Sequence, residues 1–311
     1  MTKDQLIACQ ERINPYIHRT PVLSSSLIND VVGASVVFKC DNFQKMGAFK
    51  MRGALNAILQ LSEDERAKGV VTHSSGNFAQ AVALAAKSVG VTAYIVMPSS
   101  APSVKVEAVK GYGGKVTMCE PTIEAREEGA KNIINQYGAT FVHPSNDMNV
   151  IIGNSSACKE LIEDYPDLDV VVTPVGGGGL LAGSSLAAHY FGTDCRVIAG
   201  EPMITDDAFR SLRDGVIRTD TNANTIADGL RTHLGDINFP IIQNYVDQII
   251  RVEEEEIVQA MKLIWERMKI VVEPSSAVAF AAVIKEKEQF QDKQIGIIIS
   301  GGNVDLKALP F

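Results

Sequence analysis

The chain has 311 residues, 46% of them hydrophobic, and a formal net charge of −8. This length is typical of about two domains, and the composition supplies enough apolar residues for a buried core. The acidic balance argues against nucleic-acid binding, and no apolar run approaches the roughly 18 residues of a membrane span. The amino terminus lacks a signal-peptide pattern, and the five cysteines show no CxxC spacing. We therefore expect a cytoplasmic protein with reduced thiols that binds neither nucleic acid nor membrane.

Apolar segments typical of strands alternate with segments of helical periodicity along the chain. The predicted strands are Val36–Cys40, Val70–His73, Ala93–Met97, Lys115–Cys119, Thr140–His143, Asp169–Val175, Arg196–Gly200 and Gln294–Ile299. The predicted helices are Arg52–Leu61, Asn77–Val89, Ile123–Tyr137, Asn154–Asp164, Leu180–Phe191, Glu254–Met268 and Ser275–Glu286. This alternation predicts a parallel α/β architecture.

A run of four glycines, Gly176, Gly177, Gly178 and Gly179, follows the predicted strand that ends at Val175. Because glycines let backbone N–H groups approach an anion closely and a helix follows, this turn suits a phosphate group. The same segment also satisfies the dinucleotide fingerprint. Its third small residue is Ala182, and Glu201 stands about 20 residues further on, where a ribose-binding acid is expected. The local pattern therefore leaves a nicotinamide-dependent dehydrogenase open as an alternative.

Other turns carry polar or reactive side chains that the dinucleotide pattern does not explain. Ser74, Ser75 and Asn77 lie where a strand becomes a helix, a place suited to binding a carboxylate, and Ser300 follows the last strand. Lys50 stands next to an aromatic residue, just before the predicted helix Arg52–Leu61. A lysine in a desolvated site loses its proton readily and can form a Schiff base. Together with a phosphate cradle, this lysine indicates pyridoxal 5'-phosphate (PLP).

These motifs resemble those of the serine racemase and serine/threonine dehydratase family, PLP enzymes of fold type II. The resemblance runs from about Pro21 to Leu306 and rests on Lys50 with its flanks, Ser74-Ser75-Gly76-Asn77, Gly176–Gly179, Glu273-Pro274-Ser275 and Ser300-Gly301-Gly302-Asn303. It implies two open parallel-sheet α/β domains, the smaller inserted in the larger. The large PLP-binding domain would comprise residues 1–59 and 148–311. A small mobile domain, residues 60–147, would close over the substrate.

The resemblance also implies how the cofactor is held. Lys50 would carry PLP as a Schiff base, and Phe49 would pack on its ring. Asn77 would hydrogen-bond the 3'-oxygen, Gly176–Gly179 would bind the phosphate, and Ser300 would contact the pyridine nitrogen. Because a neutral serine does not favour a protonated ring, we expect prompt β-elimination and rank dehydratase above racemase.

The implied reaction converts a β-hydroxy amino acid such as L-threonine or L-serine to a 2-keto acid and ammonia. Ser74, Ser75 and Asn77 would surround the substrate carboxylate, and Lys50 would remove the Cα proton. If Ser75 returns a proton on the face opposite Lys50, the product is the enantiomer. A binding protein without catalysis is the alternative of another class, and it would need no reactive lysine.

A metal site and further partners are implied as well. The side chains of Glu201 and Asp207 and the carbonyl of Thr205 would bind Mg²⁺ or Ca²⁺, which prefer oxygen ligands. The resemblance further implies a homodimer. A nucleotide effector could bind there through the positions of Gln80, Tyr112 and Asn303. We expect no regulatory domain after Phe311.

One residue departs from the pattern of the resemblance. Phe78 stands where the family commonly has histidine, which removes a polar contact on the substrate side and leaves 3-hydroxyaspartate open as the preferred substrate. A second substrate carboxylate could then pair with Arg126, Arg231 or His233. We assign no role to His143 or His189.

Overall fold

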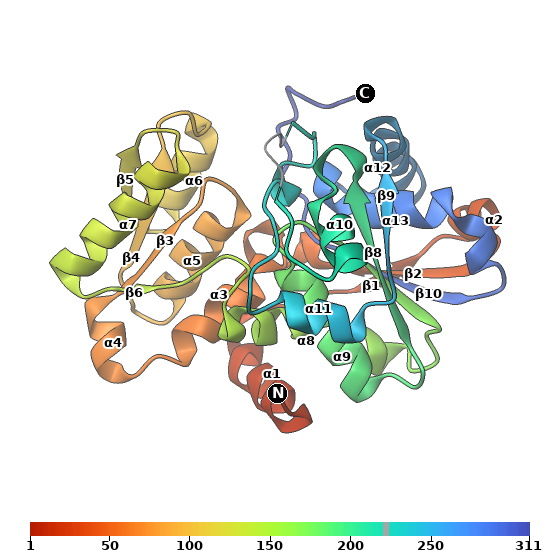
Figure 1. Ribbon diagram of the computed structural model, residues 1–311, viewed down its shortest axis with the longest axis horizontal. Coiled ribbons are helices and arrows are strands. Elements are labelled where there is room, and N and C mark those ends of the chain that lie inside the picture. Colours follow the sequence, from red (N-terminus) through yellow and green to blue (C-terminus); the bar gives the residue numbers. More distant parts are fainter. Residues whose placement is uncertain (220–223) are drawn as a thin grey trace.

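The computed structural model describes residues 1–219 and 224–311, which form two sheets flanked by helices (Figure 1). The larger sheet has the order β1-β2-β10-β7-β8-β9. Its strands are β1 (Val22–Ser24), β2 (Ser35–Cys40), β7 (Val170–Pro174), β8 (Arg196–Pro202), β9 (Gln248–Val252) and β10 (Gln294–Ile299). Only the β1–β2 pair is antiparallel among these neighbours, so the carboxyl ends of the other five strands meet at one edge.

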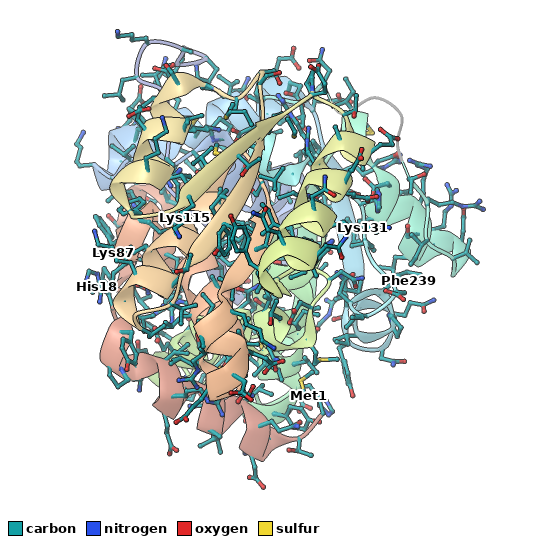
Figure 2. The ribbon with its side chains drawn as sticks, turned by 90° about the vertical axis from the view of Figure 1, so that its left-hand side faces the viewer. Met1, His18, Lys87, Lys115, Lys131 and Phe239 are labelled. Atoms are coloured by element: carbon teal, nitrogen blue, oxygen red, sulfur yellow. The ribbon has the colours of Figure 1, made fainter. Side chains whose placement is uncertain are left out.

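The smaller sheet lies between β2 and β7 in the sequence, so it is inserted in the larger fold. Its order is β5-β4-β3-β6, and all neighbouring strands are parallel. The strands are β3 (Val70–His73), β4 (Ala93–Pro98), β5 (Lys115–Cys119) and β6 (Thr140–Phe141). Figure 2 turns this side of the molecule toward the viewer, with Lys87, Lys115 and Lys131 on it.

Helices cover both faces of each sheet. Those of the larger unit are α1 (Lys3–Ile13), α2 (Ser26–Val32), α3 (Lys50–Leu59), α8 (Met148–Asp164), α9 (Gly179–Phe191), α10 (Asp207–Asp214), α11 (Phe239–Tyr245), α12 (Glu254–Met268) and α13 (Pro274–Lys285). Those around the smaller sheet are α4 (Glu63–Lys68), α5 (Asn77–Ser88), α6 (Ser103–Gly111) and α7 (Ile123–Tyr137). The short 3-10 helices are η1 (Asn14–Tyr16), η2 (Asp41–Phe43), η3 (Lys45–Gly47), η4 (Met203–Thr205), η5 (Asp228–Leu230) and η6 (Lys287–Phe290).

Strand β7 shows why both faces of the larger sheet are apolar. Val170 and Val172 belong to the core cluster that includes α12 and α13. Val171, which points to the opposite face, belongs to the cluster that includes α8 and α9. Because successive strand residues point to opposite faces, a strand buried on both sides has an unbroken apolar run. The predicted α/β class is confirmed.

Glycines bring α3, α8 and α9 unusually close together. A Cβ at Gly53 would lie 2.5 Å from Asn154 Oδ1, and one at Gly153 would lie 2.5 Å from the Arg52 carbonyl oxygen. A Cβ at Gly183 would lie 2.6 Å from the Ile151 carbonyl oxygen. Any side chain at these positions would separate the helices. This packing fixes α3, which carries Lys50.

Helix α8 begins at Met148 rather than at the predicted Asn154. The Asp147 side chain accepts hydrogen bonds from the backbone N–H groups of Asn149 and Val150, at 2.8 and 3.1 Å. Such a cap satisfies N–H groups that have no partner inside the helix.

Candidate active site

Lys50 is the first residue of α3, and its side chain enters an environment with little water. Its Nζ donates to the carbonyl oxygen of Pro144 at 3.0 Å. Burial lowers the pKa of Lys50 from 10.5 to about 8, and the nearby Glu273 carboxylate opposes part of this shift. A lysine with this pKa is a far better nucleophile and base near neutral pH than a solvated one.

Two phenylalanine rings lie near the Lys50 amine. Lys50 Nζ lies 4.8 Å from the centre of the Phe49 ring and 5.8 Å from the centre of the Phe78 ring. Both phenylalanines are buried. Phe78 stands where the resembling family commonly has histidine. It therefore gives Lys50 an apolar neighbour in place of a polar one.

The turn between β3 and α5, residues 74–77, presents polar groups on an open side and is called the serine turn below. The Ser74 N–H donates to the Val96 carbonyl, which anchors the turn to β4, and Ser74 Oγ accepts from the Gly76 N–H at 3.3 Å. A Cβ at Gly76 would meet no atom within 4 Å, and Ser75 is partly exposed. This turn at a helix N-terminus has room for a small anionic group.

Asn77 joins the serine turn to the larger sheet. Its Nδ2 donates to both carboxylate oxygens of Glu273, at 3.0 and 3.1 Å, and its Oδ1 accepts from Asn303 Nδ2 at 2.9 Å. Burial raises the pKa of Glu273 from 4.5 to about 7, although the Asn77 hydrogen bond opposes this. The carboxyl ends of the two sheets therefore meet at Asn77. The sequence indicates Glu273 only as part of a motif, and its contact with Asn77 is not predictable because the two residues are 196 positions apart.

The glycine loop, Gly176–Gly179, leads into the N-terminus of α9. Within the described residues, its backbone N–H groups have no hydrogen-bond partner. Gly178 has φ of 78°, a conformation that glycine adopts without strain. Unpaired N–H groups at the positive end of a helix form an anion site. This loop thus fits the phosphate of PLP.

Ser300 lies at the carboxyl end of β10, beside the start of α3. The Phe49 N–H donates to the Ser300 carbonyl at 2.9 Å, and Ala48 forms a β-bridge with Gly301. Ser300 Oγ lies 2.9 Å from Ser276 Oγ, either of which could be the donor. Ser276 was missed by sequence analysis because it lies inside an apolar helix pattern.

The structure thus brings Lys50, the glycine loop, Asn77 and Ser300 to the shared edge of the two sheets. Pro144, which accepts the Lys50 hydrogen bond, precedes Ser145, whose Oγ would lie 2.5 Å from a Cβ at Gly177. This set offers a reactive amine, an anion cradle and a buried hydroxyl. These are the groups that a phosphorylated pyridine aldehyde requires.

Comparison with known families gives the same result, because residues 13–301 match the pyridoxal-phosphate dependent enzymes. The chain belongs to this family. PLP is therefore its cofactor, and the predicted family and fold type II are confirmed.

Relatives cover nearly the whole chain. The chain is 50% identical to serine racemase of Dictyostelium discoideum, over 99% of this chain and 97% of the relative. It is 46% identical to beta-hydroxyaspartate dehydratase of Paracoccus denitrificans, over 100% and 98%. The crystal structure of the Dictyostelium serine racemase superposes with a TM-score of 0.94, over 98% of this chain and 99% of that one. The crystal structure of a threonine deaminase from T.th., 39% identical, gives a TM-score of 0.93 over 98% and 99%.

The three residues of the predicted metal site are buried at the end of β8 and the start of α10. Glu201 accepts from the N–H groups of Ala208 and Phe209, each at 2.8 Å, so it also caps α10. Burial raises the pKa of Glu201 well above its usual range, and the neighbouring Asp207 adds to this effect. Across the described residues, no three His, Cys, Asp or Glu side chains are placed to hold a metal. The oxygen set therefore needs the Thr205 carbonyl, and its chemistry fits Mg²⁺ or Ca²⁺.

The three candidates for a second substrate carboxylate differ in their surroundings. Arg231 is exposed and donates through Nε to the Thr225 carbonyl at 3.1 Å, and His233 is exposed beside Leu234. Arg126 instead has a buried Nε without a hydrogen-bond partner among the described residues. It lies near enough to His73, just before the serine turn, to help burial lower the pKa of that imidazole.

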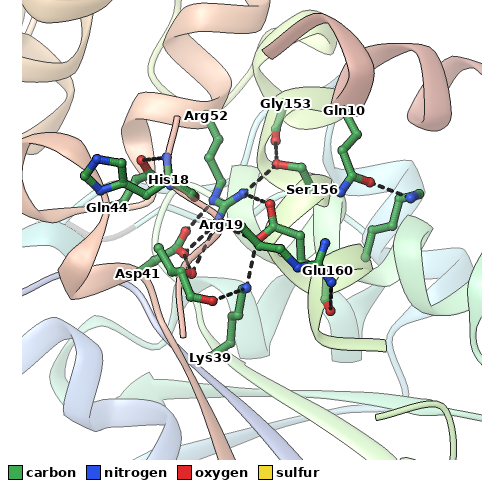
Figure 3. A network of polar contacts seen from close by, with 12 residues as sticks. Gln10, His18, Arg19, Lys39, Asp41, Gln44, Arg52, Gly153, Ser156 and Glu160 are labelled. Atoms are coloured by element: carbon green, nitrogen blue, oxygen red, sulfur yellow. Dashed lines mark hydrogen bonds and ion pairs between the residues drawn. The ribbon is translucent and has the colours of Figure 1, made fainter. Parts of the chain in front are cut away.

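A buried cluster of charged side chains connects α3 to β2, η2 and α8 (Figure 3). Arg52 Nε donates to Asp41 at 2.7 Å, Arg52 also donates to Glu160 at 2.8 Å, and Lys39 pairs with Glu160 at 2.7 Å. All four side chains are fully buried. The cluster could not be predicted from the sequence, because its members come from β2, η2, α3 and α8.

No helix in the two described ranges is long and apolar enough to span a membrane.

Proposed function

We propose that this enzyme is an ammonia-lyase that converts L-threonine or L-serine to a 2-keto acid and ammonia, with serine racemisation as a second activity. The observation that carries this proposal is the meeting of Lys50, of pKa about 8, with the glycine cradle and Ser300. The names of its relatives, which include serine racemases and a beta-hydroxyaspartate dehydratase, and a threonine deaminase of known structure support it.

When bound, PLP withdraws electrons from the substrate Cα and so makes its proton acidic. The amine of Lys50 takes this proton, because its lowered pKa leaves much of it neutral near pH 8. The serine turn holds the substrate carboxylate through Ser74, Ser75 and Asn77. Phe49 and Phe78 exclude water from the lysine. The neutral hydroxyl of Ser300 supplies no negative charge to favour a protonated pyridine nitrogen, so we rank elimination above racemisation.

Ser75 is proposed to return the proton on the face opposite Lys50 during racemisation. Its place in the partly exposed turn supports this role. The variant Ser75→Ala should lose racemisation and keep elimination. Unchanged racemisation would defeat the two-base scheme.

One observation supports 3-hydroxyaspartate as an alternative substrate. Arg126 has an unpartnered buried Nε among the described residues, and a second carboxylate would provide its partner. The test compares keto-acid release from L-serine, L-threonine and the 3-hydroxyaspartate stereoisomers. We expect serine or threonine to turn over faster, and Arg126→Ala to leave that turnover within about 3-fold. A clear preference for hydroxyaspartate that Arg126→Ala abolishes would reverse the order of the two substrates.

Glu201, Thr205 and Asp207 are proposed to bind Mg²⁺ or Ca²⁺. A ligand at about 100 times its Kd stabilises a folded protein by about 2.7 kcal/mol. Removing divalent ions with EDTA is therefore expected to lower Tm by about 5 °C, and Mg²⁺ or Ca²⁺ to restore it. The variant Asp207→Asn should lose this response. A Tm that ignores EDTA in the parent protein would exclude a stabilising metal.

Assembly and domain motion are further proposals. Exposed Leu27 and Val31 on α2 support a homodimer, which sedimentation would measure as twice the chain mass.

A nucleotide effector at the positions of Gln80, Tyr112 and Asn303 would change turnover when ATP is added. The unit 60–147 is proposed to move against residues 1–59 and 148–311, which hydrogen exchange with and without substrate would detect. All five cysteines are free thiols, in keeping with the proposed cytoplasmic location.

A further inference from the structure

Asn238 is a fully buried side chain beside the glycine loop, at the start of α11. Its Nδ2 donates to the carbonyl oxygen of Gly177 at 2.8 Å and to the carbonyl oxygen of Ser145 at 3.2 Å. Its Oδ1 accepts from the Gly235 N–H at 3.1 Å. The amide thus joins the loop after β7 to the segment that returns from the smaller sheet.

The hydrogen bond to the Gly177 carbonyl also sets the direction of an N–H group. A trans peptide is planar, so a carbonyl and the N–H of the next residue point in opposite directions. Holding the Gly177 carbonyl toward Asn238 therefore turns the Gly178 N–H away from Asn238. That N–H has no partner in the part of the chain that the structure describes.

The surroundings leave Asn238 little freedom. Asn146 Oδ1 accepts from the Ile237 N–H at 2.9 Å, and its Nδ2 donates to Asp236 at 2.8 Å, so the segment before α11 is fixed. A Cβ at Gly178 would lie 2.9 Å from Asn238 Oδ1, so the loop packs directly on the amide. Both donors of the amide face carbonyl oxygens, which a carboxylate at this position would repel.

We propose that Asn238 is a positioning residue for the cofactor phosphate, because it aims the Gly178 N–H into the cradle. This inference rests on the proposed role of Gly176–Gly179 in phosphate binding. It predicts that Asn238 matters for ligands that carry a phosphate and not for the pyridine ring itself.

The test measures the affinity of the full-length protein, freed of cofactor by dialysis against hydroxylamine and then against buffer, for PLP and for pyridoxal, which lacks the phosphate. Absorbance titration gives both values. In Asn238→Asp we expect PLP affinity to fall by about 10-fold or more, because the hydrogen bonds to the Gly177 and Ser145 carbonyls are both lost and an anion is added near the phosphate. Pyridoxal affinity should change by less than about 2-fold. Turnover is not needed for this readout.

The matched control is Asn56→Asp. Asn56 is also fully buried, and its Nδ2 holds a main-chain carbonyl, that of Asn149 at 2.7 Å, but it makes no hydrogen bond to the glycine loop. The ratio of PLP affinity to pyridoxal affinity should stay at the parent value in this control. If Asn238→Asp does not fold, Asn238→Ala is measured in the same way and should lower the ratio.

Two outcomes would overturn parts of the account separately. An unchanged ratio in the Asn238 variants, or equal losses for both ligands, would reject Asn238 as a positioning residue. A parent protein that binds PLP no more tightly than pyridoxal would instead reject the glycine loop as the phosphate cradle.

Discussion

Replacing Lys50 with alanine is expected to lower keto-acid release by about 10,000-fold or more, because the substitution removes the residue that we propose as both nucleophile and general base. The effect should far exceed that of any other single substitution at the site. Lys50 is the amine that burial places near pKa 8 among two phenylalanines. The glycine cradle does not depend on it, so the variant should still bind PLP, but borohydride should not fix the cofactor to the chain.

The control for this substitution is Lys87→Ala, at an exposed lysine of α5. Its turnover should stay within about 2-fold of the parent, and borohydride should fix PLP to it. Appreciable turnover by Lys50→Ala would reject Lys50 as the catalytic amine, whatever the control shows.

Substitution of Glu160 by alanine is expected to destabilise the fold by about 3–5 kcal/mol. The change leaves the ammonium of Lys39 buried without its carboxylate partner and the guanidinium of Arg52 buried with Asp41 alone. Burial alone would lower the pKa of Arg52, but Asp41 and Glu160 raise it, so the guanidinium stays charged. The free energy of unfolding in urea measures the loss.

Asp164 provides a matched control on the same helix, α8. It pairs with Arg19 at 2.6 Å, but both side chains are considerably exposed, at 37% and 48%. Exposed pairs contribute about 0–1 kcal/mol, so Asp164→Ala should shift the unfolding free energy by no more than that. Equal effects of the two substitutions would mean that the buried cluster does not stabilise α3.

The strands and helices that could be predicted from the sequence are those with an unbroken apolar run or a strong helical periodicity. The strands around Val71, Ile95, Val171 and Ile297 were predicted because both of their faces are buried and their apolar runs are unbroken. The edge strand Gln248–Val252 was missed, because Arg251 and the half-buried Gln248 interrupt its apolar run. Helix Ser103–Gly111 was missed because its apolar stripe is weak and few of its residues are buried.

The candidate site divides in a similar way. Ser75, Asn77 and Ser300 could be found because they directly follow strands, where polar side chains break an apolar pattern, and Lys50 because it stands beside an aromatic residue at the start of a helix. The residues that contact them could not be found in this way. Glu273, Ser276 and Asn238 act through contacts between segments far apart in the sequence, with Asn77, Ser300 and Gly177 respectively. No local pattern carries such information.

The most direct test of the proposed function is the release of keto acid and ammonia from L-serine and L-threonine by the purified protein with PLP and a divalent metal. The account predicts equal amounts of the two products from at least one of these substrates, and loss of both when borohydride fixes the cofactor to Lys50. Absence of both products from L-serine, L-threonine and every 3-hydroxyaspartate stereoisomer would contradict an ammonia-lyase.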